Sequence, residues 1–219
     1  MVKSKTATSS EVAIRPPNFQ TALFTIVGVS PYVQNKFAAK AREQMRLKQE
    51  AGSAAKKGTK REPKDFHACF EGAMHRSADG WCGVPAPAFR NGMVSACRIV
   101  GFKMTHAKLS VFIEADGYDV EDGTPLVRIT KGEPRYHESA VRNESGVCDL
   151  RARPMWDPGW EADVRVRFDA DLFTVEDIAN LLMRVGQQVG VGEGRPDSKN
   201  SCGMGWGMFR ILEEKEARR

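Results

Sequence analysis

Glycine is concentrated near the carboxyl end of this sequence, where seven glycines lie within the 22 residues from Gly186 to Gly207. Glycine loses more backbone freedom on folding than any other residue, so such a cluster needs a conformational or packing reason. The residues beside these glycines carry donors that suit phosphate and sugar oxygens: Arg195, Ser198, Lys199 and Asn200. The segment is therefore predicted to hold an extended phosphate-bearing ligand, with the bare backbone of Gly190, Gly192 and Gly194 close to it. The alternative is a linker with glycines at a tight packing point.

Two familiar glycine-rich motifs are disfavoured by the order of the elements around them. A dinucleotide-binding fingerprint follows a strand and opens a helix, whereas Gly190-Val-Gly-Glu-Gly194 follows a predicted helix and leads into a predicted strand. The phosphate loop of nucleoside triphosphatases needs a glycine directly before its lysine, and Gly194-Arg-Pro-Asp-Ser-Lys-Asn200 has none there. Single-stranded nucleic acid remains as the natural ligand class for this segment.

Positive charge is concentrated in one other segment. The chain has a net charge of +5, and the residues from Lys36 to Lys64 include ten basic and three acidic side chains. The whole positive excess therefore lies in this segment, and the rest of the chain is slightly acidic. A solvated charged helix is one interpretation, and an arm that binds a polyanion is the other. Under the second interpretation, Lys36, Arg42 and Arg46 are candidate phosphate contacts.

A predicted helix carries two further candidates, Arg90 and Arg98. They are eight residues apart, just over two helical turns, so we expect them on related faces beside the glycine segment. Either arginine would contact phosphate or pair with an acid. Three tryptophans could stack on bases, but core burial is the preferred interpretation for each: Trp156, Trp160 and Trp206.

The remaining reactive side chains form no recognisable catalytic or metal-binding motif. The four histidines are isolated in sequence, so no catalytic residue is assigned: His67, His75, His106 and His137. The five cysteines are scattered without a C-x-x-C pair, which argues against a zinc cage and a disulfide framework. We therefore expect no metal and no cofactor, and a reducing compartment, the cytoplasm. The amino-terminal residues lack an apolar signal region, and the longest apolar run is too short to span a membrane.

The periodicity of the apolar residues predicts a mixed α+β domain. Strands are expected at 23–29, 109–113, 126–130, 162–168 and 208–212, with the second and third forming a hairpin. Helices are expected at 37–50, 86–100 and 175–189, the last beginning with a capping box at Thr174 and Asp177. The strand at 23–29 is apolar at nearly every position, so we expect it to be covered on both faces. The order fits a split βαβ arrangement with two helices packed on one face of an antiparallel sheet.

The domain organisation follows from composition. Residues 1–18 are predicted to be a flexible tail and residues 213–219 a charged tail. Residues 19–212 form the predicted domain, with insertions at about 37–64 and 131–158. The second insertion is polar with few apolar runs, so we expect a long excursion from the core.

Three stretches resemble the CRISPR-associated RAMP superfamily. The segment from Val189 to Phe209 looks like its glycine-rich loop and closing strand. The segment from Val84 to Arg98 is similar to the entry into the first helix of its backbone-type subunits, and Phe24 to Pro31 to their opening strand. The resemblance implies a ferredoxin-like, RNA-recognition-type fold that holds the sugar-phosphate backbone of single-stranded RNA. It also implies partners, either other subunits or copies of this chain, and makes residues 131–158 the candidate for a hairpin thumb.

The sequence is consistent with three functions. The first is a non-catalytic single-stranded RNA-binding protein of RAMP type, in a ribonucleoprotein assembly such as a CRISPR effector or as a stand-alone relative. The second is a metal-independent endoribonuclease that uses one of the four histidines. The third is a structural or inhibitory protein that mimics a RAMP subunit and binds a protein complex.

Overall fold

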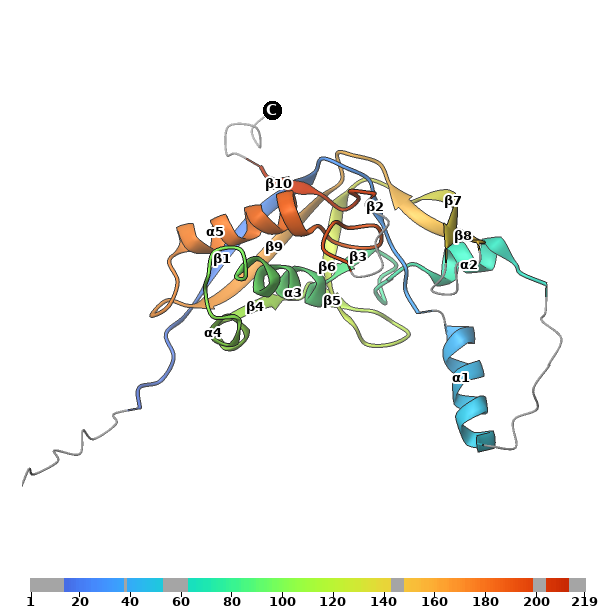
Figure 1. Ribbon diagram of the computed structural model, residues 1–219, viewed down its shortest axis with the longest axis horizontal. Helices are drawn as coiled ribbons and strands as arrows, with labels where there is room; N and C mark the ends of the chain where they lie inside the picture. The colour runs from blue at the N-terminus through green and yellow to red at the C-terminus, as the bar shows by residue number, and fades with distance from the viewer. Residues whose placement is uncertain (1–13, 38, 53–62, 143–147, 199–203, 213–219) are drawn as a thin grey trace, which may run out of the picture.

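An antiparallel sheet is the centre of the computed structural model, which describes residues 14–37, 39–52, 63–142, 148–198 and 204–212 (Figure 1). Strand β1 (Phe19–Gly28) lies between β10 (Phe209–Ile211) and β9 (Glu161–Asp169). The other edge of β9 is shared by β4 (Val111–Glu114) and β6 (Pro125–Lys131). Two short strands, β3 (Gly83–Pro85) and β5 (Gly117–Tyr118), pair with β6.

Two helices cover one face of this sheet. Helix α3 (Ala86–Ala96) and helix α5 (Val175–Arg184) pack against each other and against the sheet. The alternation of β9 explains this packing, because every second side chain, from Ala162 to Phe168, is buried beneath the helices. The predicted α+β class and the predicted packing of two helices on one face are confirmed.

Helix α5 begins as the sequence predicts. The Thr174 side chain accepts a hydrogen bond from the Asp177 N–H, and the Asp177 carboxylate accepts one from the Thr174 N–H. The helix continues into a π-helical turn, η2 (Val185–Val189), which leads into the glycine segment. Between α3 and β4 lies a short helix, α4 (Met104–Ser110). Among the described residues, none of the helices has both the length and the hydropathy needed to cross a membrane.

A second, three-stranded sheet projects from the first. Strand β8 (Cys148–Trp156) pairs with β7 (Arg135–Arg142) and with β2 (Tyr32–Val33), and α2 (Phe66–Gly72) packs on β8. The inner end is fixed by buried aromatic rings, with the Tyr32 ring 5.4 Å from that of Trp156 and 5.3 Å from that of Trp160. The predicted excursion at 131–158 is therefore a β7–β8 hairpin that extends away from the main sheet (Figure 1).

Three predictions about elements are wrong. Leu109 lies in α4, not in a strand, and its side chain is 75% exposed. Strands β4 and β6 do not form a hairpin, because both pair with the same edge of β9. The strand at 23–29 is not covered on both faces, since Leu23 is 60% exposed on the face away from the helices. Helix α3 also ends earlier than predicted, at Ala96.

The basic segment begins with a helix, as predicted. Helix α1 (Ala39–Ala51) extends away from both sheets (Figure 1). Residues 53–62, which complete this segment, and the predicted terminal tails at 1–13 and 213–219 lie outside the described residues.

Candidate functional site

A cleft of about 940 Å³ lies where the two sheets meet. Its walls come mostly from three parts of the chain: the glycine segment, the outer face of α3 and the β7–β8 hairpin. Helix α3 contributes positions 88, 91, 92 and 95, which share one face because they are three or four residues apart. The segment after β1 contributes Tyr32, Gln34 and Asn35, so the cleft joins residues from across the sequence.

The glycine segment forms one wall of the cleft in a tightly folded loop. Gly192 has a φ of +79°, and a β-carbon there would lie 2.5 Å from the Val33 carbonyl oxygen. Gly194 has a φ of +74°, and a β-carbon there would lie 2.6 Å from the Trp206 ring. The side of each glycine that would carry a β-carbon therefore packs against the protein itself. The sequence predicts instead that this side is open to a ligand. The loop still lines the cleft, at Gly190, Gly192 and Gly194.

Polar contacts hold the loop to the hairpin. The Glu193 N–H donates to the Val33 carbonyl at 2.9 Å, and the Glu193 carboxylate accepts from Arg153 Nε at 3.0 Å. Arg151 adds an ion pair to the same carboxylate at 3.6 Å. Within the loop, Arg195 Nη1 donates to the Gly192 carbonyl at 2.9 Å. The loop and hairpin walls are thus joined directly through Glu193.

Arginines and carboxylates both lie around the cleft. Two arginines, Arg151 and Arg195, and two carboxylates, Glu193 and Asp197, line it. Arg98 binds the Asp197 carboxylate with two hydrogen bonds, at 3.0 and 3.2 Å, and Arg153 pairs with Glu193. The walls thus supply arginine donors for an anionic ligand, although Arg98, Arg151 and Arg153 are each paired with a carboxylate.

The predicted site residues fall into four groups. Five of them line the cleft: Gly190, Gly192, Gly194, Arg195 and Ser198. Lys199 and Asn200 lie outside the described residues. Arg98 reaches the glycine segment through Asp197. The others, Lys36, Arg42, Arg46 and Arg90, lie away from the glycine segment.

Arg90 does not lie beside the glycine segment, contrary to the prediction. Its Nε donates to the Val111 carbonyl at 3.0 Å, its Nη2 donates to the Lys108 carbonyl, and its guanidinium lies over the Phe112 ring. The reason is helical geometry, because the cleft-facing positions 88, 92 and 95 turn position 90 toward β4. Since α3 ends at Ala96, Arg98 lies beyond the helix and does not share a face with Arg90.

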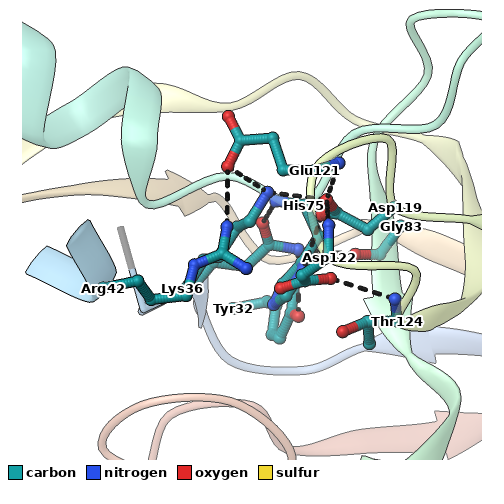
Figure 2. A network of polar contacts seen from close by, with 10 residues as sticks. Tyr32, Lys36, Arg42, His75, Gly83, Asp119, Glu121, Asp122 and Thr124 are labelled. Carbon is teal, nitrogen blue, oxygen red and sulfur yellow. Dashed lines mark hydrogen bonds and ion pairs between the residues drawn. The ribbon is translucent and has the colours of Figure 1, made fainter. Parts of the chain in front are cut away.

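The predicted phosphate contacts of the basic segment all form ion pairs. Lys36 is buried, with its side chain 3% exposed, and its Nζ lies 2.7 Å from Asp119 and 3.0 Å from Glu121 (Figure 2). It was predicted as a surface cation, and this arrangement leaves it no charge exposed to a phosphate. Arg42 lies 3.5 Å from Glu121. Arg46 is exposed and pairs with Glu43 and Glu50 on its own helix.

Asp119 is the centre of this network. Its second oxygen lies 2.9 Å from His75 Nδ1, and it also accepts from the Glu121 N–H. Burial alone would raise the pKa of Asp119, but the hydrogen bonds from Lys36, Glu121 and His75 outweigh it and lower the pKa. Burial would likewise lower the pKa of Lys36, and its bonds to Asp119 and Glu121 raise it. Both groups are therefore charged near neutral pH.

Metal binding is the other role that this cluster suggests. His75, Asp119 and Asp122 bring three possible ligand atoms within 4.8 Å of one another. The Lys36 ammonium already lies against Asp119 and supplies the positive charge that a metal ion would bring there. These residues are better described as an ion-pair network than as a metal centre.

Several cleft residues were missed from the sequence. His75 lines the cleft with its side chain 12% exposed, beside Gln34, whose Oε1 accepts from the His75 N–H. In the sequence, His75 is an isolated histidine, because its partner Asp119 is 44 residues away in the chain. Trp156 and Trp160 are fully buried, as the preferred interpretation predicts, whereas Trp206 lines the cleft.

Comparison with known proteins does not identify the chain, since neither a protein-family model nor a curated protein sequence matches it. A function must therefore be argued from the cleft and the residues around it.

His137 lies where the hairpin meets the glycine segment. Its ring packs edge-on against Trp206, with 5.7 Å between the ring centroids. Its Nε2 is buried, and within the described part of the chain it has no hydrogen-bond partner. Burial, with a contribution from the charge of Arg135, lowers the pKa of His137 below its ordinary value.

We expect this histidine to make stability depend on pH. Because the unfolded chain keeps an ordinary histidine pKa of about 6.5, it binds more protons than the folded chain just below that pH. The contribution to stability is therefore complete above about pH 6.5 and is lost as the pH falls through the folded-state pKa. Urea unfolding of His137→Phe should show a flatter pH dependence than the parent chain, whereas His106→Gln, on the surface, should show the same dependence. Identical curves for the parent and His137→Phe would contradict this.

Proposed function

We propose that this protein binds single-stranded RNA in the cleft between the glycine segment, α3 and the β7–β8 hairpin, as a RAMP-type RNA-binding protein. The observation that carries the proposal is the cleft itself. The segment in which the sequence predicts phosphate-binding donors lines an open cleft of about 940 Å³, and Arg151 and Arg195 lie in its walls. The volume lies within the range of ligand-binding clefts, and the polar and charged residues of its walls suit a polar ligand.

The topology supports the relationship to RAMP proteins. In chain order, β1, α3, β4, β9, α5 and β10 alternate as strand, helix, strand, strand, helix and strand. In space, β1 lies between β10 and β9, and β4 pairs with the far edge of β9. This is the strand order of a ferredoxin-like domain, which we propose as the fold. On the same proposal, β7–β8 is the hairpin thumb, and other subunits or copies of this chain are partners.

The chemistry of the cleft supports a nucleic-acid strand as its ligand. Arg151 and Arg195 provide charge-assisted donors for phosphate oxygens, and Asn91 and Ser95 provide neutral donors and acceptors. Trp206 places an aromatic ring in the same wall, and stacking of bases on aromatic rings beside basic residues is the common mode of single-strand binding. A flexible single strand, with its bases unpaired, fits this mixture better than a duplex does.

Fluorescence anisotropy with a labelled single-stranded RNA tests the proposal. Binding is expected at about 50 mM salt and should weaken strongly by about 200 mM, because phosphate contacts release counterions. A double-stranded RNA of the same length serves as the control and should bind more weakly. If the anisotropy of the labelled single strand did not rise on addition of the protein at low salt, the proposal would be refuted.

One observation favours a second function, a metal-independent ribonuclease. His75 is held by the buried Asp119 carboxylate and lines the cleft, an arrangement that suits a general acid or base. RNA incubated with the protein in EDTA would then give discrete fragments, and His75→Ala should abolish them while His106→Ala, on α4, should not. Intact RNA after prolonged incubation with the parent chain would leave only the binding function.

A further inference from the structure

The buried ion-pair network lies at the junction between the cleft and helix α1. Gln34 and Asn35 line the cleft, Lys36 enters the network, and α1 begins at Ala39. The network therefore fixes the start of α1 at the rim of the cleft. Arg42, on the first turns of α1, adds a second attachment through Glu121 (Figure 2).

Beyond this attachment, α1 is exposed. Its 13 residues form a helix about 20 Å long that extends away from both sheets (Figure 1). Its large apolar side chains are exposed, Met45 to 48% and Leu47 to 53%. An isolated helix of this length is marginal in water, so contact with a ligand would stabilise it.

The composition of α1 indicates an anionic ligand. The helix has four basic and two acidic residues, and the basic residue Lys48 lies in its last turn. Phe37, between Lys36 and the start of α1, is 51% exposed. An exposed aromatic ring beside basic side chains is the arrangement that stacks on unpaired bases.

We propose that Phe37 and α1 continue the RNA path out of the cleft. A base of the departing strand stacks on Phe37, and a phosphate that follows lies against Lys48, in the last turn of α1. Lys36, Asp119 and Glu121 are positioning residues that set the direction of the helix. This inference rests on the proposed binding of RNA in the cleft, and it adds a second region that contacts the same RNA strand.

The test compares oligouridylates of about 4 and about 16 nucleotides, the limits of the usual range for one single-strand-binding fold. For Phe37→Ala/Lys48→Ala, the affinity for the long oligonucleotide should fall at least about fivefold, the lower limit for loss of one stacked base. The slope of log affinity against log salt should decrease by about 0.7 for the lost phosphate contact. The affinity for the short oligonucleotide, which the cleft holds, should not change.

Two further variants make the result specific. Lys108→Ala removes the same charge from α4, on the far side of the molecule from α1 (Figure 1), and should leave both affinities unchanged. Glu121→Gln weakens the attachment of α1 while Asp119 still holds Lys36, and it should lower only the affinity for the long oligonucleotide.

Each outcome separates the two proposals. Equal losses for both lengths, or a loss with Lys108→Ala as large as with the α1 variant, would overturn the path along α1. A parent chain that binds both lengths equally would also overturn it and would leave RNA binding in the cleft intact. A parent chain that binds neither length would overturn the cleft proposal and this inference together.

Discussion

Asp119→Ala is expected to lower the free energy of unfolding by about 3–5 kcal/mol, the usual cost of removing one partner of a buried ion pair. The Asp119 side chain is fully buried, and that of Lys36 is 3% exposed. Without Asp119, the Lys36 ammonium keeps only Glu121, which is itself 44% exposed. The same substitution removes the hydrogen-bond partners of His75 Nδ1 and of the Glu121 N–H.

Urea unfolding followed by circular dichroism measures this effect, with the double variant Lys36→Met/Asp119→Leu as the control. The double variant removes both charges and replaces them with apolar side chains of similar size, so it should recover most of the lost stability. If the single and double variants were equally unstable, the loss would come from packing or from the His75 contact. A single variant as stable as the parent chain would contradict the importance of the pair.

Arg195→Ala is expected to weaken binding of single-stranded RNA at least about tenfold at low salt, because a hydrogen bond to a charged group contributes about 1.5–3 kcal/mol. Arg195 lines the cleft and belongs to the loop that forms its wall. Loss of one phosphate contact should also reduce the slope of log affinity against log salt by about 0.7, the value for a single strand. The effect should be similar for different RNA sequences, because phosphate contacts do not read bases.

The control must separate a lost phosphate contact from a disturbed loop, because Arg195 also donates to the Gly192 carbonyl. Arg195→Lys keeps the charge and should retain most of the salt slope, even if the affinity falls. If Arg195→Ala and Arg195→Lys both bound RNA as the parent chain does, Arg195 would not be part of the site. Lys199, predicted to act with Arg195, remains a prediction because it lies outside the described residues.

The features that could be predicted from the sequence depend on local patterns. The alternation along β9 and the Thr174–Asp177 capping box each lie within a few residues, and both are found in the structure. The density of glycine likewise pointed to the segment that lines the cleft. Tight packing was the alternative explanation for these glycines, but the atoms they pack against could not be predicted, because Val33 and Trp206 approach them only in the folded chain.

The errors come from contacts between distant parts of the chain. A charge count made Lys36 a surface cation, but Asp119 is brought to it from 83 residues away. Arg90 was placed by counting helical turns, which cannot show that the edge of β4 provides carbonyls for its guanidinium. Leu109 fits an alternating pattern with Val111 and Ile113, yet the chain stays helical to Ser110. Short apolar alternations are ambiguous for this reason.

The pairing of β1 has a consequence for the order in which the protein folds. Its partners are β9 and β10, and the hydrogen bond between Thr25 and Asp163 joins residues 138 positions apart. During synthesis, the central strand of the sheet must therefore wait until most of the chain has left the ribosome, while the β7–β8 hairpin can close locally. Until then, the apolar run from Leu23 to Val27 has no strand beside it, so it is exposed to misassociation with other nascent chains.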